Sequence, residues 1–181
     1  MTGPALTAEA VERGYNNRAS VPEHPQWFER WAKASAEARD RYRPALDLRY
    51  GPNPKETLDL FVPAQRARGT LMFVHGGYWR ALDKADHAFV AGPFVEQGLA
   101  VAVTNYDLCP AVSIATIVDE QRRALAWLAG EGTRHGAEAS RIVVAEASPA
   151  EQAYLGLLAA RLNLDAAATR ELDVAVKALP G

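Results

Sequence analysis

The sequence predicts an α/β fold built on a mainly parallel sheet with helices on both faces. Three apolar runs carry this prediction, at residues 70–74, 99–104 and 141–145, and none of them alternates with polar residues. Strands of this kind are buried on both faces, and segments with helical character separate them, which is the pattern of βαβ units. The parallel part of the sheet therefore begins at Thr70.

An antiparallel hairpin is expected before the parallel strands. Residues 47–50 and 57–62 alternate polar and apolar side chains, which predicts two half-exposed strands. The turn at 51–55 contains Pro52 and Pro54 and joins the two strands.

The remaining pattern is helical. Helices are predicted at 26–42, 84–97, 113–128 and 149–161, and residues 173–181 contain a candidate fourth strand. Trp27 and Trp31 share one face of the first helix, which we expect to pack on the domain. We expect a solvated face on the helix predicted at 113–128, formed by its charged residues Asp119, Glu120, Arg122 and Arg123. We predict one structural domain, in which residues 1–45 form a helical arm packed on a core of residues 46–181.

Composition narrows the classes of function. The chain has 181 residues, a formal net charge of −2 and 49% hydrophobic residues, which is typical of a soluble globular protein and argues against a nucleic-acid or membrane partner. Cys109 is the single cysteine, so no intrachain disulfide forms. The sequence has no secretory signal and no run near the roughly 18 apolar residues of a membrane span. We expect a cytoplasmic location and no cofactor.

The most informative motif is His75-Gly76-Gly77-Tyr78-Trp79, directly after the strand at 70–74. Glycines allow the backbone to approach a ligand closely and to adopt conformations closed to other residues. Backbone N–H groups at the end of a strand can bind the negative oxygen of a tetrahedral intermediate. The motif therefore predicts an anion-stabilising loop.

Four segments together resemble a known family. They are Tyr-Asn-Asn-Arg at 15–18, Leu-Asp-Leu-Phe-Val-Pro at 58–63, the loop at 75–79, and Tyr-Asp-Leu-Cys-Pro at 106–110. This combination resembles α/β-hydrolases of the kynurenine formamidase (arylformamidase) type and esterases of the hormone-sensitive-lipase group. The resemblance is strongest over residues 10–145 and weaker afterwards.

The resemblance implies hydrolysis of a small aromatic amide or ester by a Ser nucleophile with an Asp and a His. The residues implied are Ser148 as nucleophile, Gly76, Gly77 and Tyr78 in the oxyanion hole, and His75, Trp79 and Tyr106 at the substrate pocket. We expect His75 to organise the loop rather than to act as a general base. For Tyr78 and Trp79, ordinary packing beneath the hairpin is the alternative to a pocket.

The segment around Ser148 departs from the Gly-x-Ser-x-Gly pattern of this fold. Glu146 and Ala150 stand where glycines are expected, and Pro149 has no N–H to donate to an oxyanion. The same residues form a good helix start, with Ser148 as N-cap, Pro149 at the first helical position and Glu151 completing a capping box. We favour the cap over a working nucleophile.

The partners of the nucleophile are missing from their expected places. The four histidines, His24, His75, His87 and His135, all precede Ser148, and neither Asp165 nor Asp173 follows a further strand. We expect either a truncated homologue lacking the last strands of the sheet or a second chain that supplies them. An uncovered sheet edge favours pairing with another copy or chain.

Two functional hypotheses stay open. One is a serine hydrolase with impaired catalysis in the isolated chain, and the other is a non-catalytic scaffold that binds a small ligand or a partner protein. Cys109 is expected to be a buried small hydrophobic residue rather than a nucleophile. Asp83, Asp86 and His87 match no ligand spacing, so no metal is expected, and the acidic pair suits a helix start.

Overall fold

The computed structural model describes residues 7, 9 and 21–146. Its elements are, in order, α3 (His24–Tyr42), β1 (Ala45–Arg49), β2 (Thr57–Phe61), β3 (Thr70–Val74), the 3-10 turns η1 (Lys84–Asp86) and η2 (Ala88–Val90), α4 (Ala91–Glu96), β4 (Ala100–Thr104), α5 (Ile114–Ala129), η3 (Glu131–His135) and β5 (Ile142–Glu146). The helix predicted at 149–161 and the strand predicted within 173–181 lie outside the described residues.

The described strands form one mixed sheet in the order β1-β2-β4-β3-β5. β3 pairs in parallel with both β4 and β5, whereas β2 pairs antiparallel with β1 and with β4. The predicted α/β class, with an antiparallel hairpin leading into parallel strands, is confirmed. The strand predicted at 70–74 has the observed bounds.

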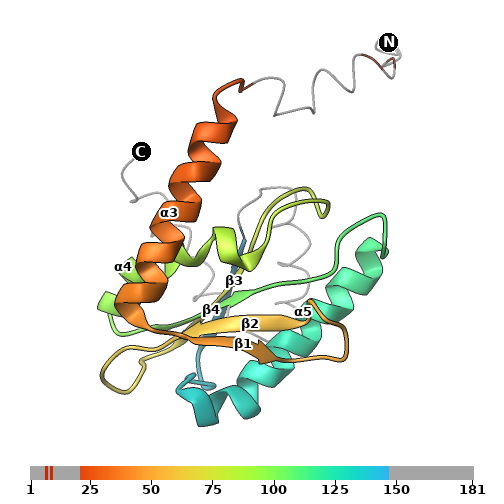
Figure 1. Cartoon of the computed structure of the whole chain (residues 1–181). Coiled ribbons are helices and arrows are strands. Elements are labelled where there is room, and N and C mark those ends of the chain that lie inside the picture. The colour runs from red at the N-terminus through yellow and green to blue at the C-terminus, as the bar shows by residue number, and fades with distance from the viewer. Residues whose placement is uncertain (1–6, 8, 10–20, 147–181) are drawn as a thin grey trace, which may run out of the picture.

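Helices cover both faces of this sheet (Figure 1). On one face, Ile117, Ala124 and Leu128 of α5 pack with a cluster that includes Leu60 and Met72. On the other face, Ala91 and Val95 of α4 pack with a second cluster that includes Phe61, Val101 and Val103. Because successive strand residues point to opposite faces, β2, β3, β4 and β5 each contribute to both clusters.

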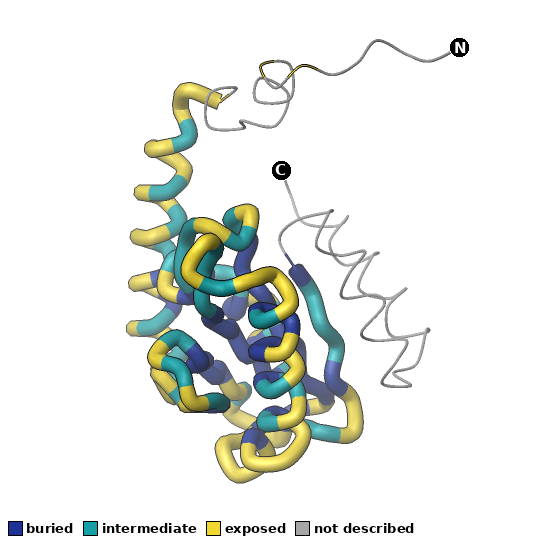
Figure 2. The backbone as a smooth tube through the Cα atoms, turned by 90° about the vertical axis from the view of Figure 1, so that its right-hand side faces the viewer, coloured by how far each residue is buried: buried dark blue, intermediate teal, exposed yellow. Residues whose placement is uncertain are grey.

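The first helix reaches beyond this core. Its C-terminal half buries Ser35 and Ala38, while the N-terminal turns extend past the sheet and carry mostly exposed residues (Figure 2). The expectation that Trp27 and Trp31 pack together on the domain is half right. The Trp31 ring lies 5.9 Å from His87 and 6.1 Å from Phe89 between centroids, but Trp27 is 45% exposed.

β2 differs from its prediction as a half-exposed strand. All five of its residues are buried, because β1 and β4 flank it and helices cover both faces. The alternation came from Asp59, which is buried yet neutralised: Lys84 Nζ contacts its Oδ1, and Arg39 Nε lies 3.5 Å from its Oδ2. A buried charge alternates in sequence like an exposed one, so the pattern does not distinguish the two cases.

The segment 84–97 also differs from the single helix predicted there. Two 3-10 turns precede the short α4, so only residues 91–96 are α-helical. Asp83 and Asp86 form a capping box around η1, with Asp83 accepting from the Ala85 N–H at 3.0 Å. This confirms the acidic pair as a helix start, although the helix is a single 3-10 turn.

The exposed face predicted for α5 is corrected at two of its four residues. Asp119 and Arg122 pair at 2.9 Å on the surface. Glu120 is fully buried, and Arg123 Nε donates to the buried Glu56 carboxylate at 2.6 Å. These two side chains hold the β1–β2 turn against the helix. In the part of the chain that is described, no helix combines the length and apolar character needed to cross a bilayer.

The buried ion pair of β2 makes a prediction about stability. Replacing Lys84 by Met leaves Asp59 as a buried charge with Arg39 as its remaining cation, so we expect a loss of about 3–5 kcal/mol in the free energy of unfolding. Lys33→Met is the matched control, because Lys33 pairs with Glu37 at 4.0 Å on the exposed side of α3 and should change stability by less than about 0.5 kcal/mol. Denaturant unfolding measures both. Equal effects from the two variants would contradict the structural role of Lys84.

Candidate active site

The carboxyl ends of the parallel strands bring the candidate residues to one edge of the sheet. Val74 of β3 lies opposite Thr104 of β4 and Glu146 of β5. His75 and Asn105 therefore follow their strands side by side, and this edge is where open α/β sheets bind ligands. Ser148 comes two residues after Glu146 and lies outside the described residues.

The loop after β3 has an unusual backbone. Gly77 has a φ of 127°, and Tyr78 and Trp79 follow with φ values of 54° and 58°. A Cβ at Gly77 would lie 2.2 Å from the Ala81 carbonyl oxygen, so only glycine fits there. Non-glycine residues at positive φ cost on the order of 1–3 kcal/mol each and persist where surrounding contacts impose them.

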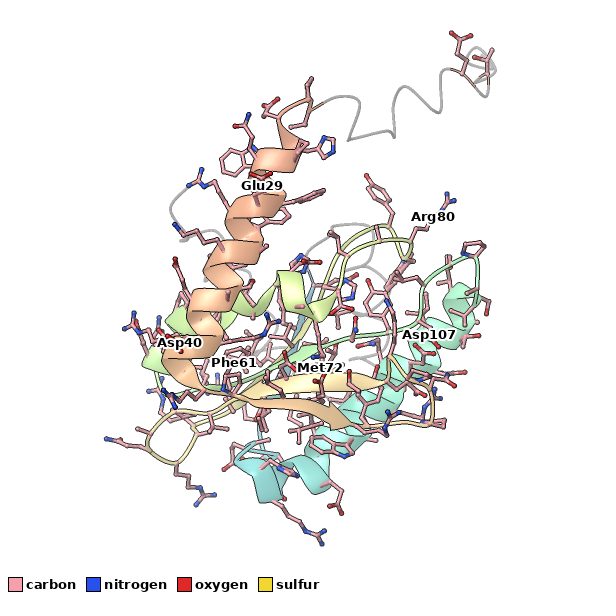
Figure 3. The ribbon with its side chains drawn as sticks, viewed as in Figure 1. Glu29, Asp40, Phe61, Met72, Arg80 and Asp107 are labelled. Atoms are coloured by element: carbon pink, nitrogen blue, oxygen red, sulfur yellow. The ribbon has the colours of Figure 1, made fainter. Side chains whose placement is uncertain are left out.

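Hydrogen bonds within the turn and from the segment after β4 impose this conformation. The Arg80 N–H donates to Gly77 O at 3.1 Å and closes the turn. The Cys109 N–H donates to Trp79 O at 2.7 Å, and the Tyr106 hydroxyl donates to His75 O at 2.6 Å. The loop and the segment after β4 are thus joined at both ends, and Figure 3 shows Arg80 and Asp107 on the same side of the molecule.

Two backbone donors of this loop remain available. The N–H groups of Gly76 and Gly77 find no acceptor among the residues that the structure describes. Gly76 is buried and Gly77 is half-buried. A buried backbone N–H without an acceptor costs the folded protein free energy. The loop is therefore suited to bind a carbonyl oxygen.

His75 lies beneath the loop with a fully buried side chain. Its ring stacks on Tyr106 at 4.2 Å between centroids with an interplanar angle of 10°, and on His87 at 5.6 Å. Nε2 lies 3.1 Å from Asn105 Oδ1 and Nδ1 lies 2.8 Å from Gly76 O. Burial lowers the pKa of His75 to about 4, so the ring is neutral at neutral pH.

The three predicted aromatic pocket residues lie at different depths. Tyr106 is fully buried under His75, and Trp79 is half-buried with its ring 5.5 Å from Tyr106. Tyr78 is 54% exposed at the outer side of the loop. The structure thus brings His75, Trp79 and Tyr106 together in one aromatic cluster, with Tyr78 outside it.

Asn105 was not singled out by the sequence. Its side chain contacts His75, the Lys84 N–H at 3.4 Å and, through Nδ2, Asp83 Oδ2 at 2.8 Å. The only signal was its position, between the end of a buried strand and Tyr106. A polar residue at the carboxyl end of a parallel strand is a candidate site residue, because ligands bind at that edge of the sheet.

Packing and helix capping account for four further residues that the sequence analysis considered as site candidates, Cys109, Asp83, Asp86 and His87. Cys109 is a half-buried free thiol that packs against the main cluster, rather than fully buried as expected. His87 is buried between Trp31, Phe73 and Phe89. Within residues 7, 9 and 21–146, no three His, Cys, Asp or Glu side chains converge in a way that could hold a metal ion.

The strand order, the hairpin and the glycine loop after β3 are those of an α/β-hydrolase, and the chain is similar to formamidases and esterases of that fold. The chain belongs to the BD-FAE family, whose model matches residues 58–178. Among curated proteins it is similar to kynurenine formamidases, with 32% identity to that of Salmo salar over 49% of this chain and 34% identity to that of Drosophila melanogaster over 45%.

Solved structures agree with this assignment. A provisionally assigned thioesterase from Silicibacter sp. tm1040 superposes with a TM-score of 0.67 and 34% identity over 73% of this chain. Esterase B from Lactobacillus rhamnosis, inhibited by a tributyrin phosphonate, superposes with a TM-score of 0.53 and 25% identity over 65%. The aligned regions span 31% and 27% of the two formamidases, and 49% and 43% of the two solved chains.

The buried imidazoles predict how stability depends on pH. Burial lowers the pKa of His75 from 6.5 to about 4 and also lowers that of His87. The unfolded chain therefore binds protons at a higher pH than the folded chain. The contribution of these neutral rings to the free energy of unfolding is fully present above pH 6.5. It is lost as the pH falls towards 4, by about 3 kcal/mol for His75.

Denaturant unfolding between pH 7 and pH 4.5 measures this slope. His87→Phe, which keeps an aromatic ring among aromatic neighbours, should reduce the slope. His135→Gln is the control, because His135 is exposed, and it should leave the slope unchanged. A wild-type stability that does not change over this range would contradict the buried neutral state of the two rings.

Proposed function

We propose that the His75–Trp79 loop binds the carbonyl group of a small aromatic amide or ester. In this proposal the N–H groups of Gly76, Gly77 and Tyr78 stabilise the developing oxyanion. Ser148 is the candidate nucleophile. The formamidase and esterase relatives support the choice of an amide or ester carbonyl.

The observation that carries the proposal is the pair of unsatisfied donors in Gly76 and Gly77. Both stand at the carboxyl end of β3, and a strained backbone that Tyr106 and Cys109 hold in place orients them. Preorganised donors need no rearrangement when charge develops on a bound oxygen, which is the basis of oxyanion stabilisation.

The aromatic cluster supports an aromatic substrate. Trp79 offers its half-buried ring beside the donors, and His75 and Tyr106 hold that region from beneath. The neutral, buried His75 is poorly suited to act as a general base, because both of its ring nitrogens are already engaged with oxygen atoms. We therefore assign His75 and Tyr106 to the pocket as supporting residues and Trp79 as the contact.

Catalysis by the 181-residue chain is proposed to be impaired. Pro149 removes one oxyanion donor, which typically costs about 10²–10³ in rate. Glu146 also stands where the nucleophile turn of this fold has a glycine, which works against the sharp turn that exposes the nucleophile.

A non-catalytic scaffold is the alternative proposal. The buried Glu146 at the end of β5 favours it, because a long acidic side chain stands where the nucleophile turn of this fold has a glycine. Such a scaffold would bind the same class of ligand or a protein partner, including a second copy or a different chain that adds to the sheet.

Ligand binding and turnover separate these possibilities. Formanilide, a small aromatic formamide, should shift the amide proton resonances of Gly76 and Gly77 downfield in heteronuclear NMR spectra. Gly77→Ala should abolish this shift because the Cβ meets Ala81 O, and Gly130→Ala is the control with a Cβ contact of 3.6 Å. The absence of any shift in the wild type would contradict the binding proposal.

Turnover is measured with N-formylkynurenine and a short-chain nitrophenyl ester. We expect hydrolysis far below the typical enzyme rate of about 10 s⁻¹, with any residual rate lost in Ser148→Ala. Turnover near that typical rate, lost in the same variant, would contradict impaired catalysis and show that a base is recruited from an unexpected place.

A further inference from the structure

The Asn105 side chain has one orientation that its neighbours permit. Nδ2 lies 2.8 Å from Asp83 Oδ2, and Oδ1 faces the Lys84 N–H at 3.4 Å. The opposite orientation would set Oδ1 against a carboxylate and the amide group against another N–H donor. Burial acts to raise the pKa of the Asp83 carboxyl, but hydrogen bonds from Ala85 and Asn105 lower it overall, so the carboxylate that fixes Asn105 is ionised.

This orientation determines which nitrogen of His75 carries the proton. Two oxygen acceptors face the ring, Asn105 Oδ1 at Nε2 and Gly76 O at Nδ1. A neutral imidazole has one N–H and can satisfy only one of them. The Asn105 oxygen is the fixed one, since its amide cannot turn without opposing Asp83, whereas Gly76 O belongs to the loop itself.

We propose that Asn105 is a positioning residue for the His75–Trp79 loop, and that with Asp83 it holds His75 in the tautomer protonated on Nε2. With that bond made, the His75 ring stays stacked on Tyr106, whose hydroxyl in turn holds the His75 carbonyl at 2.6 Å. Gly76 and Gly77 come directly after His75 in the sequence, and their N–H groups are the ones proposed to bind the ligand oxygen.

The tautomer depends on contacts within the described residues alone. The effect of Asn105 on ligand binding rests on the proposed function of the loop. The experiment therefore reads the two parts separately.

The first readout is the ring ¹⁵N spectrum of histidine-labelled protein at pH 7. Protonated and unprotonated ring nitrogens have well-separated chemical shifts, and their couplings to the ring protons identify each nitrogen. We expect His75 to carry its proton on Nε2 in the wild type. In Asn105→Leu, which is similar in size, the proton should move to Nδ1, because Gly76 O is then the only acceptor.

Asn53→Leu is the matched control. Asn53 is also an amide in a polar contact, with Nδ2 3.3 Å from Glu120 Oε1, and among the described residues its side chain makes no hydrogen bond to His75 or to the His75–Trp79 loop. The tautomer should not change in this variant. A wild-type proton on Nδ1, or an Nε2 proton retained in Asn105→Leu, would overturn the assignment. If Asn105→Leu does not fold, Asp83→Asn tests the same chain of contacts, because it frees the amide to turn and should give a mixture of tautomers.

The second readout is formanilide binding, followed at the Gly76 and Gly77 amides. Asn105→Leu should weaken binding about tenfold, the equivalent of one hydrogen bond, and Asn53→Leu should leave it unchanged. Equal binding by the wild type and Asn105→Leu would overturn the positioning role. If the wild type does not bind formanilide, the proposed function of the loop fails, while the tautomer result stands by itself.

Discussion

Asn105 stands where the elements of the ligand edge meet, and its hydrogen bonds reach each of them. Its N–H donates to Thr57 O of β2 at 2.9 Å, and its carbonyl accepts from the Tyr50 hydroxyl and from Gln121 Nε2 of α5. Its side chain contacts His75 and η1. The contact with His75 is made because β3 and β4 run parallel and end together. A buried amide of this kind stabilises the fold only if all its groups are satisfied, so each partner fixes the others.

The same polar region explains why a strained loop persists. Glu120 holds the Asp107 N–H at 2.9 Å, which fixes the chain just after Tyr106. The segment after β4 can then bind the loop through Tyr106 and Cys109 without yielding. Backbone strain at Gly77–Trp79 is therefore balanced by hydrogen bonds to a rigid neighbour. The strained residues adjoin the Gly76 and Gly77 N–H groups that we propose bind a ligand.

The sequence predicts the parts of this molecule whose signals are local. The run at 70–74, the hairpin and the glycine loop were found because apolar continuity, turn residues and glycines report directly on backbone conformation. Asp59 and Glu120 were misjudged because burial of a charge depends on partners, Lys84 for one and the Asp107 N–H for the other, that lie far along the chain. The prediction of a single helix over 84–97 was wrong for a related reason. Asp83 caps a 3-10 turn there, and His87 is drawn into aromatic contacts with Trp31 and Phe89.

The central claim is that Asn105 holds the loop and the segment after β4 in one rigid unit. Amide hydrogen exchange tests it most directly, with the Arg80, Lys84 and Cys109 amides as reporters. The Arg80 and Cys109 amides donate to the loop, and the Lys84 amide donates to the Asn105 side chain. In Asn105→Ala we expect these three amides to exchange about tenfold faster or more, while those of the β3–β4 pairing change only with global stability. Unchanged protection of the three reporters in the variant would contradict the account, because the loop would then hold its conformation without Asn105.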